Sequence, residues 1–372
     1  MIYLDHAATT PVSESALKVF TEVSTNFYGN TSSLHDVGSS AKGLLDHCRE
    51  SLAHLIDAPT KGVYFTSGGT ESNILAIRAL LRARQHKGNH LITTTMEHSS
   101  LYNYFQYLEN EWGFEVTYLE VNQEGQISTQ AVRDAIQDNT ILASIHHANS
   151  EVGVIQPLSE IGEILQRHDI LFHSDCVQSF GKLPINIQAL NLDSLSISSH
   201  KIYGPKGVGA AYVNPLLSWK TDPFNQSQEN GFRPGTINTP GIAAFVTAAQ
   251  EICESYSDTH DYLVQLQAEF AKQFKELGIK GKIVASPQQL PNIIGIVLDS
   301  VQGDYAMLEL NRLDIAVSTG SACSVGQQKP SKTLLSLGYT EEEAKRFIRL
   351  SMGKHTSKHE LDKVLDALIT IL

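Results

Sequence analysis

The chain has 372 residues, of which 41% are hydrophobic and 18% charged, as in a globular protein long enough for two domains. Its net charge of −12, with acidic and basic residues interspersed, disfavours direct binding to nucleic acid. No run approaches about 18 apolar residues, so we expect a cytoplasmic protein without membrane contact.

From about residue 60 to 215, β-rich runs alternate with helical patterns, which favours a mostly parallel sheet with helices on both faces. Helices are predicted at 71–84, 99–112, 129–137 and 158–167, and Ser128 is a candidate N-cap. We therefore expect an α/β large domain with a seven-stranded sheet. Its predicted strands are 63–66, 91–95, 115–121, 141–147, 170–174, 194–198 and 209–213.

The pattern changes after about residue 240, where a long helical stretch, 240–277, leads into shorter elements. A long helix followed by short strands and helices predicts a second, smaller α+β domain packed closely against the first. Its predicted strands are 282–285, 292–298, 315–318 and 347–351, and its predicted helices are 305–313 and 358–368.

Four cysteines are too few and too scattered for a disulfide framework. Cys48 and Cys253 lie in the helical patterns 41–55 and 241–256, where burial is the ordinary outcome. Cys176 follows a strand end. Cys323 differs, because it lies among small, turn-forming residues and so needs a partner or a reaction.

Three stretches of the first domain contain candidate functional residues. Two glycines in 67–73 lie between a strand and a helix, as in a phosphate cradle, although such a turn is also common without a ligand. Asp175 ends a strand where ligands bind in doubly wound sheets. Lys201 follows a later strand among hydroxyls and a histidine, as a lysine nucleophile toward an aldehyde would.

A phosphate cradle, a carboxylate and a nucleophilic lysine are together what pyridoxal phosphate requires. The cofactor withdraws electrons only while its ring nitrogen keeps a proton, which a nearby carboxylate favours. His173 shares a strand face with Asp175, which raises a metal site as an alternative. We find no third ligand at metal spacing, so no intrinsic metal is predicted.

With these motifs the sequence resembles the cysteine desulfurases with the longer active-site loop, pyridoxal-phosphate enzymes of fold type I, over almost its whole length. The resemblance implies a large domain of residues 15–256, and a small domain of residues 1–14 and 257–372 that carries the loop at about 318–331. The motifs that carry it are 3–10, 30–35, 67–73, 97–99, 147–153, Asp175 with Gln178, 198–201, 233–236, 321–323 and 348–351.

The resemblance also assigns roles to residues. Lys201 would bind the cofactor covalently, Asp175 would pair with its ring nitrogen, and His98 would stack on the ring. Thr236 would reach the phosphate from the other subunit of a homodimer. The implied cofactor-binding residues are Gly69, Thr70, His98, Asn149, Asp175, Gln178, Ser198, His200, Lys201 and Thr236.

Arg349, helped by Asn30, would hold the substrate carboxylate, as a planar fork of donors can. An isolated arginine is also often part of a structural ion pair, and His98 could simply begin a helix. Both alternatives are left open by the sequence.

The implied reaction removes sulfur from L-cysteine, which leaves L-alanine and a persulfide on Cys323. Lys201, His98 and Cys323 would be catalytic, and either His98 or the substrate amine would take the thiol proton. A protein acceptor would then receive the sulfur: an iron–sulfur scaffold, an apo iron–sulfur enzyme or a tRNA-thiolation protein. The resemblance implies one metal contact, in which Cys323 transiently binds an iron–sulfur cluster.

Two departures from the family concern the acceptor. Lys329 stands where glutamate is usual, and the chain stops at Leu372, without the extension of longer relatives. The alternatives are a different fold-type I enzyme, such as a selenocysteine lyase or an aminotransferase, and a non-catalytic sulfur carrier.

Overall fold

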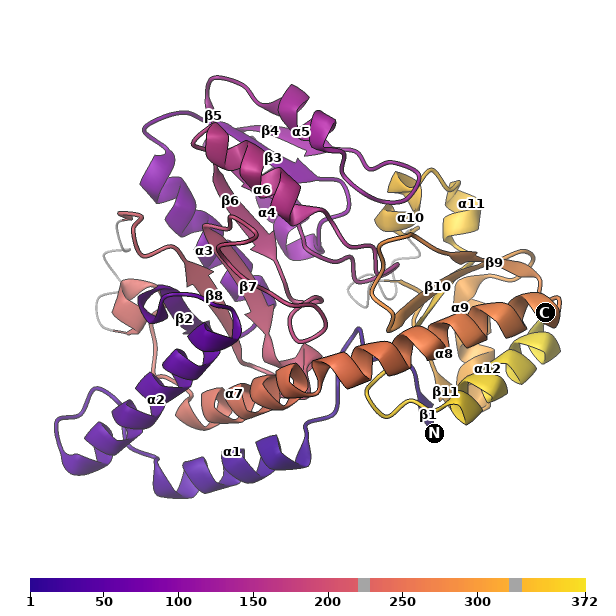
Figure 1. The fold of residues 1–372 in the computed structure, drawn as a ribbon, viewed down its shortest axis with the longest axis horizontal. Helices are drawn as coiled ribbons and strands as arrows, with labels where there is room; N and C mark the ends of the chain where they lie inside the picture. The colour runs from indigo at the N-terminus through magenta and orange to yellow at the C-terminus, as the bar shows by residue number, and fades with distance from the viewer. Residues whose placement is uncertain (220–227, 321–329) are drawn as a thin grey trace.

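A computed structural model describes residues 1–219, 228–320 and 330–372 of the chain. Its largest element is a seven-stranded sheet in the order β2-β8-β7-β6-β5-β3-β4 (Figure 1). Only β8 runs antiparallel to its neighbours, so the prediction of a mostly parallel sheet is confirmed. The strands are β2 (Val63–Thr66), β3 (His90–Thr94), β4 (Glu115–Leu119), β5 (Thr140–Ser144), β6 (Leu171–Asp175), β7 (Ser194–Ser198) and β8 (Gly209–Val213).

Helices cover both faces of this sheet, because alternate residues of each buried strand point to opposite sides. Leu142 packs with α3 (Gly69–Arg84) and α4 (Ser99–Trp112) on one face. Its neighbour Ala143 packs with the other face's core, to which α5 (Thr129–Ala135) and α6 (Leu158–Arg167) contribute. Ser128 caps α5 as predicted, since its hydroxyl accepts from the backbone N–H of Ala131 at 3.0 Å.

The first two helices, α1 (Glu14–Asn26) and α2 (Asp36–Leu55), pack against α7 (Thr239–Glu254). They lie at one end of the molecule (Figure 1). The long helical stretch predicted at 240–277 is two helices, because the chain leaves helical geometry at Ser255 before α8 (Tyr256–Glu276) begins. The two helices run from the large sheet to the smaller one (Figure 1).

The rest of the chain surrounds an antiparallel sheet in the order β12-β10-β9, with its own apolar core. The N-terminal strand β1 (Ile2–Tyr3) joins this part by pairing with β11 (Ile315–Ala316). The predicted domain limits stay a prediction, to which the separate cores lend support. The other elements are β9 (Gly281–Val284), β10 (Ile293–Leu298), α9 (Gly303–Arg312), α10 (Lys332–Ser336), α11 (Glu341–Ala344), β12 (Phe347–Ser351) and α12 (Lys358–Ile371).

Among the helices of the described residues, none combines the length and the apolar character needed to cross a membrane.

Candidate active site

Lys201 ends the short 3-10 turn Ser199–Lys201 that follows β7. Its ammonium donates to the carbonyl oxygens of Ala7 and Ala8, the latter at 2.9 Å. The backbone N–H of Thr10 also donates to the carbonyl of His200 at 2.8 Å. The segment after β1 therefore passes directly over the lysine that the sequence marked as the nucleophile.

Asp175, at the end of β6, is buried and held by two donors. Its Oδ2 accepts from Nδ2 of Asn73 at 2.8 Å, and its Oδ1 accepts from the backbone N–H of Val177 at 2.9 Å. The carboxylate is thus fixed in orientation without a cation, which leaves its charge available to a ligand that carries a proton on a ring nitrogen.

Asn73 joins Asp175 to two further side chains that the sequence did not single out for this role. Its Oδ1 lies 3.2 Å from Nε2 of His173, and its Nδ2 donates to the hydroxyl of Ser100 at 3.1 Å. Burial lowers the pKa of His173 to about 4, so its imidazole is neutral. The stretch 67–73 contains Asn73, but only the fold brings α3, α4 and β6 together.

His98 is the N-cap of α4, which was the structural alternative for this residue. Its Nδ1 accepts from the backbone N–H of Ser100 at 3.2 Å and lies 2.8 Å from the Ser100 hydroxyl. A backbone N–H can only donate, so the neutral ring carries its proton on Nε2. His98 is exposed, and the capping bond holds it at the start of α4.

The predicted phosphate cradle is the turn between β2 and α3. Gly68 has φ +152°, a backbone conformation that side chains disfavour, and as N-cap it offers no side-chain acceptor to the first amides of α3. A Cβ on Gly69 would meet Cγ2 of Val177 at 2.8 Å. The helix start therefore stays open to an anion, with Thr70 exposed beside it.

Ser198, at the end of β7, lies beside this turn, since its Oγ is 3.9 Å from the place of a Cβ on Gly68. His200 follows in the 3-10 turn Ser199–Lys201. The hydroxyl of Ser198 is buried and has no hydrogen-bond partner among the described residues. His200 Nδ1 lies 3.2 Å from the hydroxyl of Thr9. Burial, together with the nearby cations Lys201, Lys206 and Lys182, lowers the pKa of His200 to about 4, so it would meet a phosphate as a neutral donor.

Gln178 and Asn149 differ in how their amides are used. Gln178 Nε2 donates to the carbonyl of Ala7 at 2.8 Å, while its buried Oε1 has no partner within the described part of the chain. Asn149 is engaged at both ends: Oδ1 accepts the backbone N–H of Glu151 and Nδ2 lies 3.4 Å from the Thr333 hydroxyl. Gln178 Oε1 could therefore accept a hydrogen bond from a ligand. Asn149 instead links the chain after β5 to Thr333.

Arg349 in β12 is 2% exposed and forms an ion pair with Asp5, at 2.6 Å between Nη2 and Oδ1. Its Nη1 donates to the carbonyl of Ser150 at 2.9 Å, and its Nε has no partner among the described residues. Asn30 lies in the turn between α1 and α2, where its Oδ1 accepts from Ser32 N. The connection between α1 and α2, which contains Asn30, lies at the opposite end of the molecule from the small sheet with β9 and β10 (Figure 1).

Cys323 and Lys329 lie outside the described residues, but the chain on either side of them is described. Ser318 exchanges two backbone hydrogen bonds with Arg349. On the far side, Ser331 and Thr333 donate to the two oxygens of Glu151, at 2.5 and 3.0 Å. The described residues on the two sides of this segment are thus bound to Arg349 and to Glu151. Thr236 is exposed before α7.

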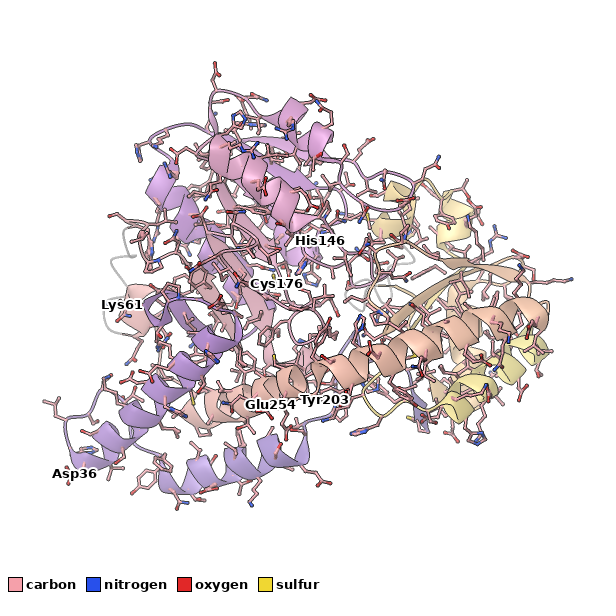
Figure 2. All side chains as sticks on the ribbon, in the orientation of Figure 1. Asp36, Lys61, His146, Cys176, Tyr203 and Glu254 are labelled. Carbon is pink, nitrogen blue, oxygen red and sulfur yellow. The ribbon has the colours of Figure 1, made fainter. Side chains whose placement is uncertain are left out.

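The other three cysteines are poor nucleophiles. Burial raises the pKa of Cys176, inside the large domain (Figure 2), to about 12, and the pKa values of Cys48 and Cys253 to about 11. Cys48 is buried as predicted, and Cys253 is half-buried. No cluster of three or more possible metal ligands occurs in the described ranges 1–219, 228–320 and 330–372.

The site fits pyridoxal phosphate on its own geometry. Two buried polar atoms, Ser198 Oγ and Gln178 Oε1, lack partners among the described residues, and the start of α3 has no side-chain cap there, as a phosphate and a ring hydroxyl would require. Asp175 and Lys201 supply the carboxylate and the amine.

Comparisons with known proteins cover the whole chain. The model of the family "Aminotransferase class-V" matches residues 2–364. The putative cysteine desulfurase NifS of Bacillus subtilis is 46% identical over 98% of this chain and 93% of its own length. The cysteine desulfurase IscS of Methanosarcina thermophila is 36% identical over 100% of this chain and 92% of its own.

Solved structures show the same likeness. A NifS-like protein superposes with a TM-score of 0.92 at 28% identity, over 100% of this chain and 98% of its own. A structure described as SspA in complex with cysteine superposes with a TM-score of 0.84 at 34% identity, over 96% of this chain and 100% of its own.

Proposed function

Because the chain belongs to the aminotransferase class-V family, we propose that it is a cysteine desulfurase, dependent on pyridoxal phosphate, that moves sulfur from L-cysteine to Cys323. The full-length similarity to proteins named cysteine desulfurase carries this proposal. The open cradle, Asp175 and Lys201 support the cofactor.

The cofactor would be held at both of its ends. The first amides of α3, with Thr70, Ser198 and His200, would bind its phosphate, and Asp175 would keep the ring nitrogen protonated. Gln178 Oε1 would accept from the ring hydroxyl, and Lys201 would hold the aldehyde carbon. When bound, the cofactor accepts the electrons released at the α-carbon of the substrate.

The chain's own residues then determine which substrate reacts. Arg349 would bind the α-carboxylate of cysteine, and its Nε, without a partner among the described residues, could supply a hydrogen bond. Lys201, released by the substrate, can take a proton as a neutral amine. The neutral ring of His98 presents Nε2–H, so on that side it donates a proton or a hydrogen bond and does not accept one. This tautomer favours the substrate amine over His98 Nε2 as the acceptor of the thiol proton.

Cys323 would attack the sulfur of the bound substrate as a thiolate. The carbon–sulfur bond breaks as a sulfur–sulfur bond forms, and the carbon left behind takes up a proton, so cysteine and the thiol become alanine and a persulfide. The persulfide sulfur passes to a protein acceptor. This acceptor would serve iron–sulfur cluster assembly or another thio-cofactor pathway.

A homodimer would complete the site. The first two helices and their connection expose several large apolar side chains, and Leu34 is 100% exposed, which is typical of an uncovered interface. In the sequence these residues flank Asn30, whose connection between α1 and α2 lies far from the small sheet of its own chain (Figure 1). A second copy of the chain would bring Asn30 and Thr236 to the site. The exposed apolar residues are Leu17, Phe20, Tyr28, Leu34 and Val37.

One experiment tests the function. The purified protein should be yellow and should lose that colour on borohydride reduction, with the cofactor then found on the peptide that contains Lys201. It should convert L-cysteine to equal amounts of alanine and sulfide in the presence of a thiol reductant. Cys323→Ala should keep the colour and lose sulfide release, with Cys253→Ala as the matched control.

Sulfide release unchanged in Cys323→Ala would contradict the mechanism and favour a lyase without a persulfide. Colour without any release from cysteine would favour an aminotransferase of the same fold. A colourless protein without a reducible adduct would favour a non-catalytic carrier.

A further inference from the structure

A carboxylate lies at the turn between β2 and α3, where the cofactor phosphate is proposed to bind. Glu71 belongs to the first turn of α3, and its Oε2 accepts from the backbone N–H of Ser67 at 2.6 Å. Burial would raise the pKa of Glu71, but hydrogen bonds from Ser67 and Arg233 lower it below its usual value, so the side chain is charged at neutral pH. A second anion at this turn is therefore repelled unless a cation offsets the charge of Glu71.

Arg233 supplies that cation. Its Nε donates to Glu71 Oε2 at 2.7 Å, so one oxygen accepts from both Ser67 and Arg233. Both side chains of the ion pair are partly exposed, and such pairs add little to the stability of a fold. The carboxylate points back to Ser67, which precedes the helix, while the first amides of α3 have no side-chain cap within the described ranges. The amides are thus left for another anion.

The segment before Arg233 is anchored to strand β2. Arg49 and Glu229 form two charge-assisted hydrogen bonds of 2.7 Å, and the Glu229 carboxylate also accepts from the backbone N–H of Phe65 at 2.7 Å. Glu229 and Asn230 have φ values of +46° and +51°, which side chains disfavour. Backbone of this kind persists only where neighbouring contacts hold it. Arg233 therefore reaches the turn from a segment that the large domain itself holds in place.

We propose that Arg233 is a positioning residue for the phosphate of the cofactor and acts through Glu71. It holds the carboxylate at Ser67, away from the first amides of α3, and offsets its charge, so that the turn accepts a phosphate dianion. Arg233 touches neither cofactor nor substrate in this role. The inference rests on the proposed function only through the binding of pyridoxal phosphate at this turn.

The test compares pyridoxal phosphate with pyridoxal, which lacks the phosphate. The full chain is freed of cofactor, and both dissociation constants are measured by equilibrium dialysis. Arg233→Met should raise the dissociation constant of pyridoxal phosphate about tenfold and that of pyridoxal less than about twofold, because only the phosphate meets the uncovered carboxylate. Arg233→Lys keeps the charge and should raise the constant for pyridoxal phosphate less than about threefold. Arg233→Gln serves in place of the methionine variant if that protein does not fold.

The deciding variant combines Arg233→Met with Glu71→Gln. Both charges are then gone, while the glutamine oxygen can still accept from Ser67, so the affinity for pyridoxal phosphate should return to within about threefold of the wild type. Glu71→Gln alone should bind pyridoxal phosphate at least as tightly as the wild type. A merely structural role of Arg233 would not be rescued in this way. Failure of the double variant to recover, or an equal loss of affinity for pyridoxal, would overturn the inference.

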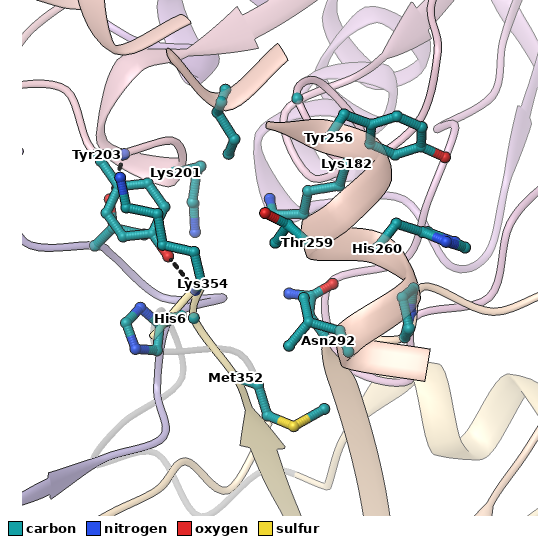
Figure 3. A pocket seen from close by; sticks show the side chains of 16 residues that line it. His6, Lys182, Lys201, Tyr203, Tyr256, Thr259, His260, Asn292, Met352 and Lys354 are labelled. Atoms are coloured by element: carbon teal, nitrogen blue, oxygen red, sulfur yellow. Dashed lines mark hydrogen bonds between the residues drawn. The ribbon is translucent and has the colours of Figure 1, made fainter. Parts of the chain in front are cut away.

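Lys354→Met is the matched control for the loss of a positive charge elsewhere in the site. Lys354 lines a cavity together with Lys201 and lies 4.8 Å from the centre of the Tyr203 ring (Figure 3). Lys201 would bind the aldehyde, which both ligands share, so this variant should change the two dissociation constants by the same factor. A loss of affinity confined to pyridoxal phosphate in Lys354→Met as well would also overturn the inference.

The outcomes separate the inference from the proposed function. If the wild type binds pyridoxal phosphate and the Met and Gln variants of Arg233 bind it equally well, the role of Arg233 alone is refuted. A wild-type protein that binds no pyridoxal phosphate would refute the proposed function and this inference together.

Discussion

The buried Arg349 forms an ion pair with the partly exposed Asp5, 2.6 Å between Nη2 and Oδ1, so a carboxylate of the chain itself binds the arginine that is proposed to bind the substrate. The substrate carboxylate would have to share or displace this partner. Asp5 also keeps the guanidinium paired when the site holds no substrate, which avoids the cost of a lone buried charge.

Arg349→Lys should therefore weaken cysteine binding without removing the cofactor. Lysine keeps the charge but loses the planar fork, a loss of about 1.5–3 kcal/mol, or roughly ten- to a hundredfold in kcat/KM for alanine formation. The exposed Arg312→Lys, paired with Glu309 on the surface, should leave the rate unchanged. An unaltered kcat/KM in Arg349→Lys would mean that the ion pair is only structural.

Asn73→Ala should loosen the cofactor site, because it removes the amide that fixes Asp175 and His173. We expect the free energy of unfolding to fall by about 1–3 kcal/mol, as for other buried groups left without a partner, and the cofactor to dissociate faster. Denaturant unfolding and loss of visible absorbance on dialysis measure the two effects. The exposed Asn311→Ala is the control, and equal cofactor retention in both variants would contradict the proposed bridge.

Glu151→Gln should slow sulfur transfer while leaving the colour intact. The carboxylate accepts from both Ser331 and Thr333, and an amide can accept at only one of its two ends. Loss of one charge-assisted bond, about 1.5–3 kcal/mol, should lower the rate of alanine formation at least about tenfold. The exposed Glu120→Gln should match the wild type. A full rate in Glu151→Gln would show that these anchors do not help to place Cys323.

Acid should destabilise the protein through its buried histidines. Burial holds the pKa values of His147 and His173 at about 4, below the value of about 6.5 in an unfolded chain. The unfolded state therefore binds protons first as the pH falls, and the folded state loses about 1.4 kcal/mol per pH unit for each imidazole between about pH 6.5 and 4.

His147→Gln isolates one of these contributions. Its free energy of unfolding, measured with urea at neutral pH and at about pH 5, should depend on pH less steeply than that of the wild type by about one proton. The exposed His86→Gln should keep the steeper dependence. Parallel curves for His147→Gln and the wild type would show that His147 is not buried as a neutral group.

Much of the fold follows from local patterns. The strands Val63–Thr66, Ser194–Ser198 and Gly209–Val213 have the predicted limits. The first and third are short β-rich runs, the second alternates serine with Leu195 and Ile197, and turn-forming residues bound them. Helix α1 was not predicted, since it buries only Ala16 and Val23 and leaves Leu17 exposed. The break at Ser255 was not predicted either, because the sequence there contains neither glycine nor proline.

The site was less predictable than the fold. Lys201 and Asp175 were found from their places at strand ends, where chemistry is common. The bridge through Asn73 depends on the packing of α3 against β6, and the ion pair of Asp5 with Arg349 depends on the N-terminal segment running parallel to the end of β12. Such contacts join residues far apart in the sequence, so no local pattern contains them.

The pairing of β1 with β11 has a consequence for synthesis of the chain. Ile2 pairs with Ile315, which is translated 313 residues later (315 − 2). The carbonyl of Leu4 accepts from the backbone N–H of Ser351, which is translated later still. At about 5–20 residues per second, the start of the chain spends roughly 15–60 s on the ribosome without its partners. Lys201 emerges long before the carbonyls of Ala7 and Ala8 are fixed over it. The site is therefore completed last, on a chain that is almost fully translated.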